Sequence, residues 1–194
     1  MPHEILIGLG GNLPSGAGAP IDTLRAALRE LQERGLTLKA VSRAYCTTPV
    51  PPSGQPDFVN AVAAFETTLS PDECLDILKT VETALGRQRG ERWSARTLDL
   101  DLLAAGDTVA PDATTWRHLA FEADPMAVHE PLVLPHPRLH GRGFVLMPLM
   151  DIAPGWLHPV TGETVAAMAA ACEKAGGFEG VRPIGALLGK GASL

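Results

Sequence analysis

Hydrophobic and polar positions recur with clear periods along the first half of the chain. Residues 4–12 begin as a short apolar strand and then run into glycines, which free the backbone for a sharp turn. Residues 20–35 place apolar side chains at helical spacing, and Gly35 is a suitable stop. Residues 36–47 alternate between apolar and polar side chains. These patterns predict a strand, a helix and a second strand.

The next segments repeat this order. Residues 48–57 carry four prolines and a glycine, which exclude regular structure there. Residues 58–69 read as a third strand, and residues 70–87 as a helix that opens with a serine cap, a proline and acidic residues. A strand containing Asp99 and Asp101 follows. The order β-α-β-β-α-β predicts the α+β class with a ferredoxin-like sandwich, an antiparallel sheet with helices packed on it.

The second half of the chain has weaker patterns. Residues 105–143 look irregular, residues 144–153 predict a short helix near the core, and residues 161–177 predict a last amphipathic helix. Thr161 or Thr164 would cap that helix. We expect the tail, about residues 185–194, to be frayed or disordered. No linker is long enough to divide the chain, so residues 1–194 are predicted to form a single domain.

Composition and charge narrow the possible partners. The chain has 194 residues and a formal net charge of −6, so it has no general attraction to nucleic acids or anionic membranes. Three widely separated cysteines show no metal-binding spacing and suit a reducing compartment. The start lacks a secretory signal, and no apolar stretch approaches the length of a membrane span. We predict a cytoplasmic monomer.

Two carboxylates interrupt the apolar strand that begins near residue 98. Side chains two residues apart in a strand share a face, so Asp99 and Asp101 would project together, roughly 6–7 Å apart along the chain. Two neighbouring carboxylates repel each other unless a partner offsets their charge. Mg²⁺ would offset it, and two ions could bridge the pair and a polyphosphate. Pairing of each aspartate with a nearby arginine would explain the same spacing.

A cluster of arginines precedes the carboxylates. Arg87, Arg89, Arg92 and Arg96 crowd into ten residues and supply more donors than two aspartates require. Guanidinium groups match phosphate oxygens well, and Trp93 among them offers a flat face for a heterocycle. Acidic metal ligands beside such arginines indicate phosphoryl or nucleotidyl transfer.

Two further motifs carry weaker signals. The sequence GLGGN, residues 8–12, resembles a dinucleotide fingerprint only loosely, and we interpret it as a turn rather than a phosphate cradle. His136 and His140 have a spacing seen in zinc sites, but Pro137 and Gly141 argue against a helix there. A hydrogen bond from His136 to a phosphate is the favoured interpretation.

Three segments together resemble the 6-hydroxymethyl-7,8-dihydropterin pyrophosphokinase family. They are residues 47–62, residues 82–103, which include R-W-x-x-R-T-L-D-L-D, and residues 134–154, which include P-H-P-R and R-G-F. The resemblance implies a transferase of folate biosynthesis with a ferredoxin-like fold. Such an enzyme transfers the pyrophosphoryl group of ATP to the hydroxymethyl group of the pterin and releases AMP.

The resemblance also implies roles for particular residues. Asp99 and Asp101 would hold two Mg²⁺ ions and, with Arg87 and Arg96, form the catalytic set. The pterin-binding set would be Thr48, Pro49, Val50, Pro51, Phe58, Asn60, Trp93 and Phe144. The ATP-binding set would be Lys79, Glu82, Arg89, Arg92, Trp93, Arg96, Leu102, His136 and Arg142.

Other interpretations stay open at the level of sequence. Phe58 and Phe144 could be ordinary core residues, which is the commoner fate of phenylalanine. Asn60 differs, because an amide in an apolar strand must find hydrogen-bond partners. Another two-metal transferase would leave Phe58, Asn60 and Phe144 without a shared ligand. A ferredoxin-like RNA-binding module would need a basic surface and exposed aromatic residues. An inactive paralogue with a structural role is a further alternative, but it would not need the paired aspartates and the cluster of arginines.

Overall fold

The structure, a computed structural model, describes residues 1–49, 54–87, 95–123 and 132–188. Its elements, in chain order, are β1 (His3–Gly11), α1 (Pro20–Glu33), β2 (Thr37–Val41), β3 (Arg43–Thr47), β4 (Phe58–Thr67), α2 (Pro71–Ala84), β5 (Asp99–Ala105), α3 (Ala113–Phe121), the 3-10 helix η1 (Leu139–Gly141), α4 (Gly143–Ile152), α5 (Val165–Lys174) and β6 (Val181–Ala186).

The strands form one antiparallel sheet in the order β5-β1-β4-β3-β6, and β2 also pairs with β4. An antiparallel sheet with helices packed on it confirms the predicted α+β, ferredoxin-like class. The single strand predicted over residues 36–47 is wrong in one respect, because Ser42 divides it into β2 and β3. The Ser42 hydroxyl accepts a hydrogen bond from the Val62 backbone N–H of β4 at 3.0 Å.

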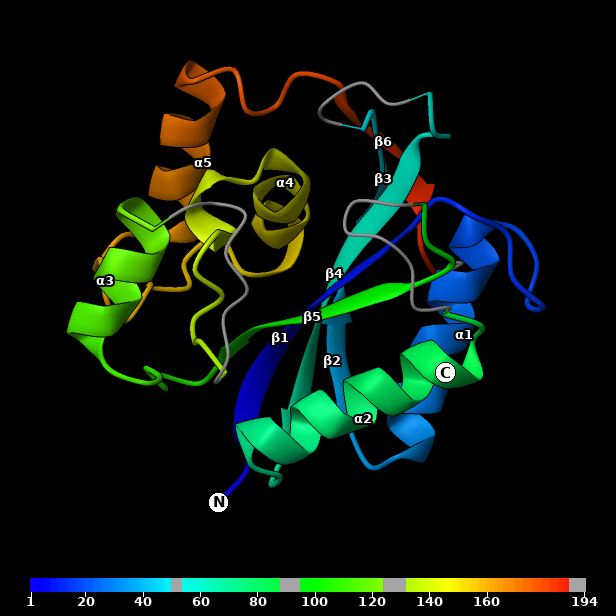
Figure 1. Cartoon of the computed structure of the whole chain (residues 1–194), viewed down its shortest axis with the longest axis horizontal. Helices are drawn as coiled ribbons and strands as arrows, with labels where there is room; N and C mark the ends of the chain where they lie inside the picture. The colour runs from blue at the N-terminus through cyan, green and yellow to red at the C-terminus, as the bar shows by residue number, and fades with distance from the viewer. Residues whose placement is uncertain (50–53, 88–94, 124–131, 189–194) are drawn as a thin grey trace.

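Helices cover both faces of the sheet (Figure 1). On one face α1 and α2 bury the larger core, to which β1 contributes Ile5, Ile7 and Leu9. On the other face α4 and α5 bury a second core, which includes Leu6 of β1 and Val62 of β4. The alternation follows from the two-residue period of a strand. It places the side chains of Asp99 and Asp101 on the α4 side, because Leu98, Leu100 and Leu102 enter the larger core.

The two predicted helices of the first half are confirmed. Helix α2 begins after Ser70, whose hydroxyl accepts from the Glu73 backbone N–H while the Glu73 carboxylate accepts from the Ser70 N–H. This reciprocal pair satisfies donors that a helix start leaves open. Helix α1 begins at Pro20, and Gly35, with φ of +91°, follows its end. Glycine adopts this left-handed conformation without steric cost.

The glycines near the start of the chain lie inside a strand. We predicted that they make a sharp turn, but β1 continues through Gly8 and Gly10 to Gly11 and pairs with β4 and β5 along that stretch. That part of the prediction is wrong. Pairing on both sides keeps the strand extended despite the low strand propensity of glycine.

Two predictions for the second half of the chain need correction. Residues 105–143 were predicted to be irregular, but α3 forms within them, with the Asp112 carboxylate accepting from the Thr114 and Thr115 N–H groups. The tail was predicted to fray from residue 185, but Gly185 and Ala186 belong to β6, which pairs with β3, and Leu187 is buried. Residues 189–194 lie outside the described residues.

The two predicted helices of this half are confirmed. Helix α4 covers residues 143–152, and α5 begins after Thr164, whose hydroxyl accepts from the Ala167 N–H. The cysteines Cys46, Cys74 and Cys172 are free and buried, as small apolar side chains would be. Within the described part of the chain, no helix is long and apolar enough to cross a membrane.

Candidate active site

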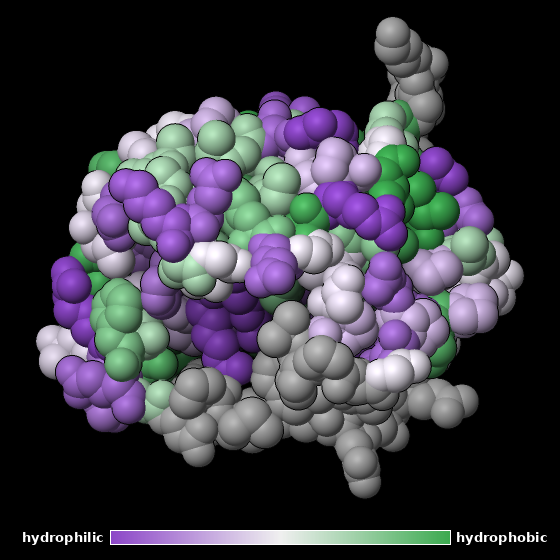
Figure 2. All heavy atoms as spheres, turned by 90° about the horizontal axis from the view of Figure 1, so that it is seen from above, coloured by the Kyte–Doolittle hydropathy of each residue, from purple (hydrophilic) through white to green (hydrophobic). Residues whose placement is uncertain are grey.

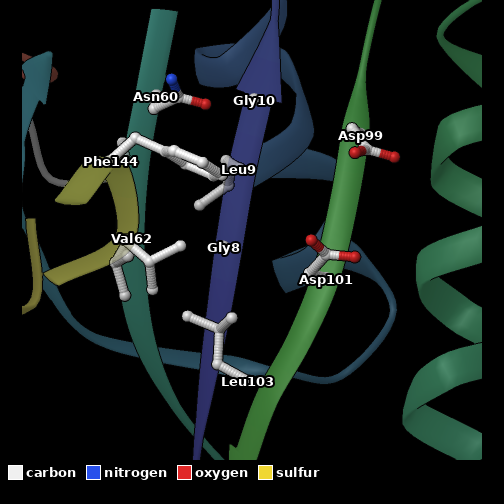
Figure 3. A pocket seen from close by; sticks show the side chains of 11 residues that line it. Gly8, Leu9, Gly10, Asn60, Val62, Asp99, Asp101, Leu103 and Phe144 are labelled. Atoms are coloured by element: carbon white, nitrogen blue, oxygen red, sulfur yellow. The ribbon is translucent and has the colours of Figure 1, made fainter. Parts of the chain in front are cut away.

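A partly open cavity of about 330 Å³ lies on the α4 side of the sheet. Its lining comes from β1, β4, β5 and α4: Gly8, Leu9, Gly10, Asn60, Ala61, Val62, Asp99, Asp101, Leu103, Phe144 and Val145. In Figure 3, Asn60 and Phe144 lie on one side of β1, and Asp99 and Asp101 lie on the other side.

Glycines in β1 create the space between these two sides. The register pairs Gly10 with both Asn60 and Asp99, and pairs Gly8 with Asp101. A Cβ atom on Gly10 would lie 2.7 Å from Asn60 Oδ1, which is closer than real atoms approach. Strand β1 therefore has glycine at residue 10, where any larger side chain would clash with Asn60.

The two aspartates share a face but not their partners. Asp99 Oδ1 lies 2.9 Å from Arg87 Nη1 and 2.8 Å from Arg96 Nη1. The Asp101 carboxylate has no ion pair or hydrogen bond to the described residues. Pairing with arginine, one of the alternatives above, therefore holds for Asp99 and not for Asp101. Burial and the neighbouring Asp101 carboxylate raise the pKa of Asp99, and the charges of Arg96 and Arg87 oppose that rise.

Glu82 fixes Arg87 from the other side of the sheet. Its side chain is only 8% exposed, pairs with Arg87 Nη1, and accepts a hydrogen bond from the Leu100 backbone N–H at 2.7 Å. Burial raises the pKa of Glu82 to about 7. Glu82 therefore joins α2 to β5 and orients Arg87 toward Asp99, although it does not line the cavity. The helix pattern carries no signal of this role, since Glu82 looks like an exposed polar residue of an amphipathic helix.

Asn12 performs a similar task for Arg96. The side chain is buried, and its Oδ1 accepts from the Arg96 N–H at 2.7 Å. Its Nδ2 donates to the Pro56 carbonyl at 3.1 Å and to Gln55 Oε1 at 3.3 Å. One amide thus ties the end of β1 to the segments before β4 and β5. Sequence reasoning missed this role, because all of its partners are distant in the chain.

Asn60 lies at the other side of the cavity with part of its amide in use. Its Nδ2 donates to Thr47 Oγ1 of β3 at 2.9 Å, and the residue is buried. Phe58, two residues earlier, lies half-buried on the same face of β4 and does not line the cavity. The amide therefore has one hydrogen-bond partner within the described part of the chain, and the residue lines the cavity.

Phe144 enters the cavity from the first turn of α4. The Arg142 guanidinium carbon lies 5.4 Å from the centre of the Phe144 ring, a cation–π distance. Helix α4 is tied to β3 by Asp151, which accepts from Tyr45 Oη at 2.9 Å and from Arg43 Nη2 at 2.6 Å. These bonds hold the helix, and hence the Phe144 ring, against the sheet.

His136 and Arg142 lie near the carboxylates without lining the cavity. His136 Nδ1 accepts a hydrogen bond from the Arg138 backbone N–H at 3.1 Å, so the ring proton belongs on Nε2. Burial lowers the pKa of His136 to about 3, with smaller effects from Arg142 and Arg138. The ring is therefore a neutral donor at physiological pH. Burial also lowers the pKa of Arg142, which the charges of Asp101 and Asp99 counteract.

His140 lies elsewhere, in an aromatic cluster formed by Trp116, Phe121, His140 and His158. The two histidines of the zinc interpretation therefore face different surroundings. Across the described ranges, no group of three or more His, Cys, Asp or Glu side chains is arranged to hold a metal.

Several predicted residues do not reach the cavity. Lys79 is exposed on α2, where it pairs with Asp76, and the Leu102 side chain is buried in the larger core. Thr48 and Pro49 directly follow β3, and the Thr48 N–H donates to the Gly180 carbonyl at 3.4 Å. Five predicted residues lie outside the described ranges: Val50, Pro51, Arg89, Arg92 and Trp93.

The carboxylate pair fits a hard divalent cation. The Asp101 carboxylate has no hydrogen-bond partner among the described residues, and burial together with the neighbouring Asp101 charge raises the pKa of Asp99. Mg²⁺ commonly binds through one or two carboxylates and completes its shell with water and substrate phosphates. The surface seen in Figure 2 is hollowed near its centre, and hydrophilic side chains line the hollow.

Comparisons with known sequences agree with the resemblance of the motifs. Residues 6–154 match the family model described as 7,8-dihydro-6-hydroxymethylpterin-pyrophosphokinase (HPPK). A 2-amino-4-hydroxy-6-hydroxymethyldihydropteridine pyrophosphokinase of Pseudomonas aeruginosa is 36% identical over 182 residues, 93% of this chain and 96% of the relative. Its counterpart in Haemophilus influenzae is 39% identical over 148 residues, 76% of this chain and 79% of the relative.

Solved structures share the fold. The chain in a crystal structure of Plasmodium falciparum HPPK-DHPS A437G with SDX-DHP matches with a TM-score of 0.66 and 15% identity. The match covers 94% of this chain and 49% of that one, so this chain spans about half the length of the solved chain.

Proposed function

The chain belongs to the family of 7,8-dihydro-6-hydroxymethylpterin pyrophosphokinases, and we propose that the cavity beside Asp99 and Asp101 is its active site. The protein is a transferase of folate biosynthesis that moves pyrophosphate from ATP to 6-hydroxymethyl-7,8-dihydropterin and releases AMP. In this reaction the hydroxyl oxygen of the pterin bonds the β-phosphorus of ATP, the bond from that phosphorus to the AMP oxygen breaks, and the hydroxyl proton is lost.

One observation carries the proposed site: Asn60 and Phe144 share a single cavity with Asp99 and Asp101. A stacking ring and a buried amide suit a flat heterocycle with donors and acceptors on its edge. Paired carboxylates suit the metal ions that accompany a polyphosphate. The two sides of the cavity therefore match the two substrates, and the hydroxymethyl group of a bound pterin would extend from one side toward the other.

On the pterin side, the proposed contacts are Asn60 and Phe144, with Phe58, Thr48 and Pro49 adjacent. The free groups of the Asn60 amide would read the polar edge of the ring, while Phe144 would stack on its face. Val50, Pro51 and Trp93 stay predictions for the same ring.

On the phosphate side, Asp99 and Asp101 would hold two Mg²⁺ ions. When bound, such ions neutralise the phosphate charge and favour loss of the proton from the attacking hydroxyl. Arg87 and Arg96, which pair with Asp99 in this structure, can turn their remaining N–H groups toward phosphate oxygens. His136 Nε2 and Arg142 would donate from the α4 side.

Lys79, Glu82 and Leu102 were predicted to contact ATP. The geometry favours an indirect role for Glu82, through its bonds to Arg87 and the Leu100 N–H. Contacts of ATP with Lys79, Leu102, Arg89 and Arg92 remain proposals.

The setting of the reaction is also a proposal. Three free, buried cysteines suit the reducing environment of the cytoplasm. ATP and the pterin are the proposed partners of a monomer, and the net charge of −6 gives no reason to add nucleic acid or membrane.

A product assay tests the function directly. The purified protein should form AMP from ATP when Mg²⁺ and 6-hydroxymethyl-7,8-dihydropterin are both present, and should form none when either is omitted. Release of ADP in place of AMP would show simple kinase chemistry and contradict the proposal.

A further inference from the structure

Helix α3 contacts the segment that carries His136. Trp116 of α3 is fully buried, and its Nε1–H donates to the backbone carbonyl of Pro135 at 2.6 Å. Pro135 immediately precedes His136. The helix lies beside this segment, away from α1 and α2 (Figure 1).

The backbone around His136 is fixed on either side of that bond. Leu134 exchanges two backbone hydrogen bonds with Ala110, at 2.9 and 3.0 Å. The His136 N–H donates to the Leu103 carbonyl of β5 at 2.8 Å. Proline has no N–H, so the carbonyl is the one backbone hydrogen-bonding group that Pro135 offers. Trp116 satisfies it, and thereby fixes the peptide plane that leads into His136.

Helix α3 is itself held in place by several contacts, so the hydrogen bond from Trp116 can fix the position of the Pro135 carbonyl. The Trp116 ring packs edge-on against His158, with centroids 4.7 Å apart, and Arg117 Nη2 donates to the Val160 carbonyl at 2.6 Å. Asp112 caps the start of the helix. Trp116 is also the centre of a third small core, with Val133 and Val160.

We propose that Trp116 is a positioning residue for ATP, which holds the Pro135 carbonyl and so aims the His136 imidazole at a phosphate group. The inference rests on the proposed function, because it needs His136 to contact ATP. Trp116 touches neither substrate and acts through His136 alone. A displacement of about 1 Å in a group that contacts the substrate can cost two orders of magnitude in reaction rate, so the loss of one anchor is measurable.

Trp116→Phe keeps an aromatic ring in the core and removes the N–H donor. Affinity for α,β-methylene-ATP with Mg²⁺, measured by calorimetry, should fall on the order of tenfold. Pterin affinity, measured at saturating nucleotide analogue, should stay within about twofold because Asn60 and Phe144 are untouched. Trp156→Phe is the matched control: Trp156 also packs against His158, at 5.5 Å, and should leave both affinities unchanged.

A double-mutant cycle separates positioning from loss of stability. His136→Ala should weaken binding of the analogue, and Trp116→Phe should add no further loss in that background. An equal loss from Trp116→Phe with and without His136 would overturn the inference, as would no loss in either. If His136→Ala itself leaves nucleotide affinity unchanged, the proposed role of His136 fails first, and the inference with it.

A second variant decides the matter if Trp116→Phe does not fold. Arg117 is exposed, so Arg117→Met loosens α3 without emptying the core. It should weaken nucleotide binding by about two- to threefold, again only while His136 is present. Unchanged nucleotide affinity in a folded Arg117→Met protein would then overturn the inference.

Discussion

Asp99 and Asp101 lie two residues apart on one strand, yet their surroundings differ. Asp99 accepts from two arginines, whereas Asp101 faces the cavity without a partner in the described part of the chain. The arginines therefore hold Asp99 in place before any ligand binds. Asp101 keeps its oxygen atoms available, which makes it the better residue in which to test the metal site.

Asp101→Asn should reduce AMP formation by about two orders of magnitude or more, because a neutral amide is a poor Mg²⁺ ligand. Thermal unfolding should show the same or slightly higher stability, since the change removes repulsion from Asp99. Asp107→Asn, at an exposed position just after β5, is the control and should leave both measurements unchanged. Near-normal turnover of Asp101→Asn would remove Asp101 from the metal site.

Among individual residues, the sequence predicted the placement of those whose pattern can be recognised from neighbouring positions alone. The two-residue period of a strand was enough to put both aspartates on one face, and the isolated amide of Asn60 stood out in an apolar strand. The sequence did not predict the hydrogen-bonding roles that Asn12 and Glu82 have in the structure. Each acts through partners in distant segments, Asn12 through Arg96 and Pro56, and Glu82 through Leu100.

Among the elements, β1 determines how much space the cavity has. It is the middle strand between β4 and β5, and it presents glycine where the other two strands present Asn60 and Asp99. A methyl group at Gly10 would collide with Asn60 Oδ1 at 2.7 Å, whereas one at Gly8 would rest 3.5 Å from Leu103. The two positions share a strand and a face, so they form a matched pair.

Gly10→Ala should weaken pterin binding by about tenfold, because Asn60 must rotate away from Thr47 to make room. Gly8→Ala should weaken it much less, and its thermal stability should be equal to or above that of the unaltered protein. Calorimetry at saturating nucleotide analogue measures the first effect, and a thermal scan measures the second. Equal pterin affinities for the two variants would show that Asn60 does not read the pterin.

Elements with strong local signals were predicted, and those that depend on tertiary contacts were not. Helix α2 carries its own capping box, and β4 its own apolar run. Helix α3 has only nine residues and one buried side chain, Trp116, so its periodicity is faint, although Asp112 was an available cap signal. Strand β6 is almost wholly exposed and contains Pro183, so only its pairing with β3 makes it a strand.

In the whole molecule, the site forms where segments far apart in sequence meet on one face of the sheet. The third core, around Trp116, extends that arrangement beyond the ferredoxin-like unit, and the buried His158 packs against Trp116. His158 Nδ1 accepts from the Val160 and Thr161 N–H groups at 3.2 and 3.3 Å, and its Nε2 has no partner in the described ranges. Burial lowers the pKa of His158 to about 4, from an ordinary value of 6.5.

This histidine makes the fold sensitive to acid. Between pH 6.5 and 4 the unfolded chain binds a proton at His158 and the folded chain does not, so the free energy of unfolding falls as the pH falls through this window. The loss should reach up to about 3 kcal/mol. Urea unfolding across this window should show a shallower fall for His158→Asn and an unchanged one for the control His118→Asn, which alters an exposed histidine. Parallel curves for His158→Asn and the unaltered protein would contradict the assignment.

The proposed active site requires one cavity to hold the pterin against Asn60 and Phe144 and the metal-bound phosphates against Asp99 and Asp101. A crystal structure with α,β-methylene-ATP, 6-hydroxymethyl-7,8-dihydropterin and Mn²⁺ in place of Mg²⁺ tests it most directly, because Mn²⁺ is located by its anomalous scattering. We expect Mn²⁺ bound by both carboxylates, with the pterin ring stacked on Phe144 and its edge hydrogen-bonded to Asn60. A metal away from the two aspartates, or a pterin bound outside this cavity, would contradict it.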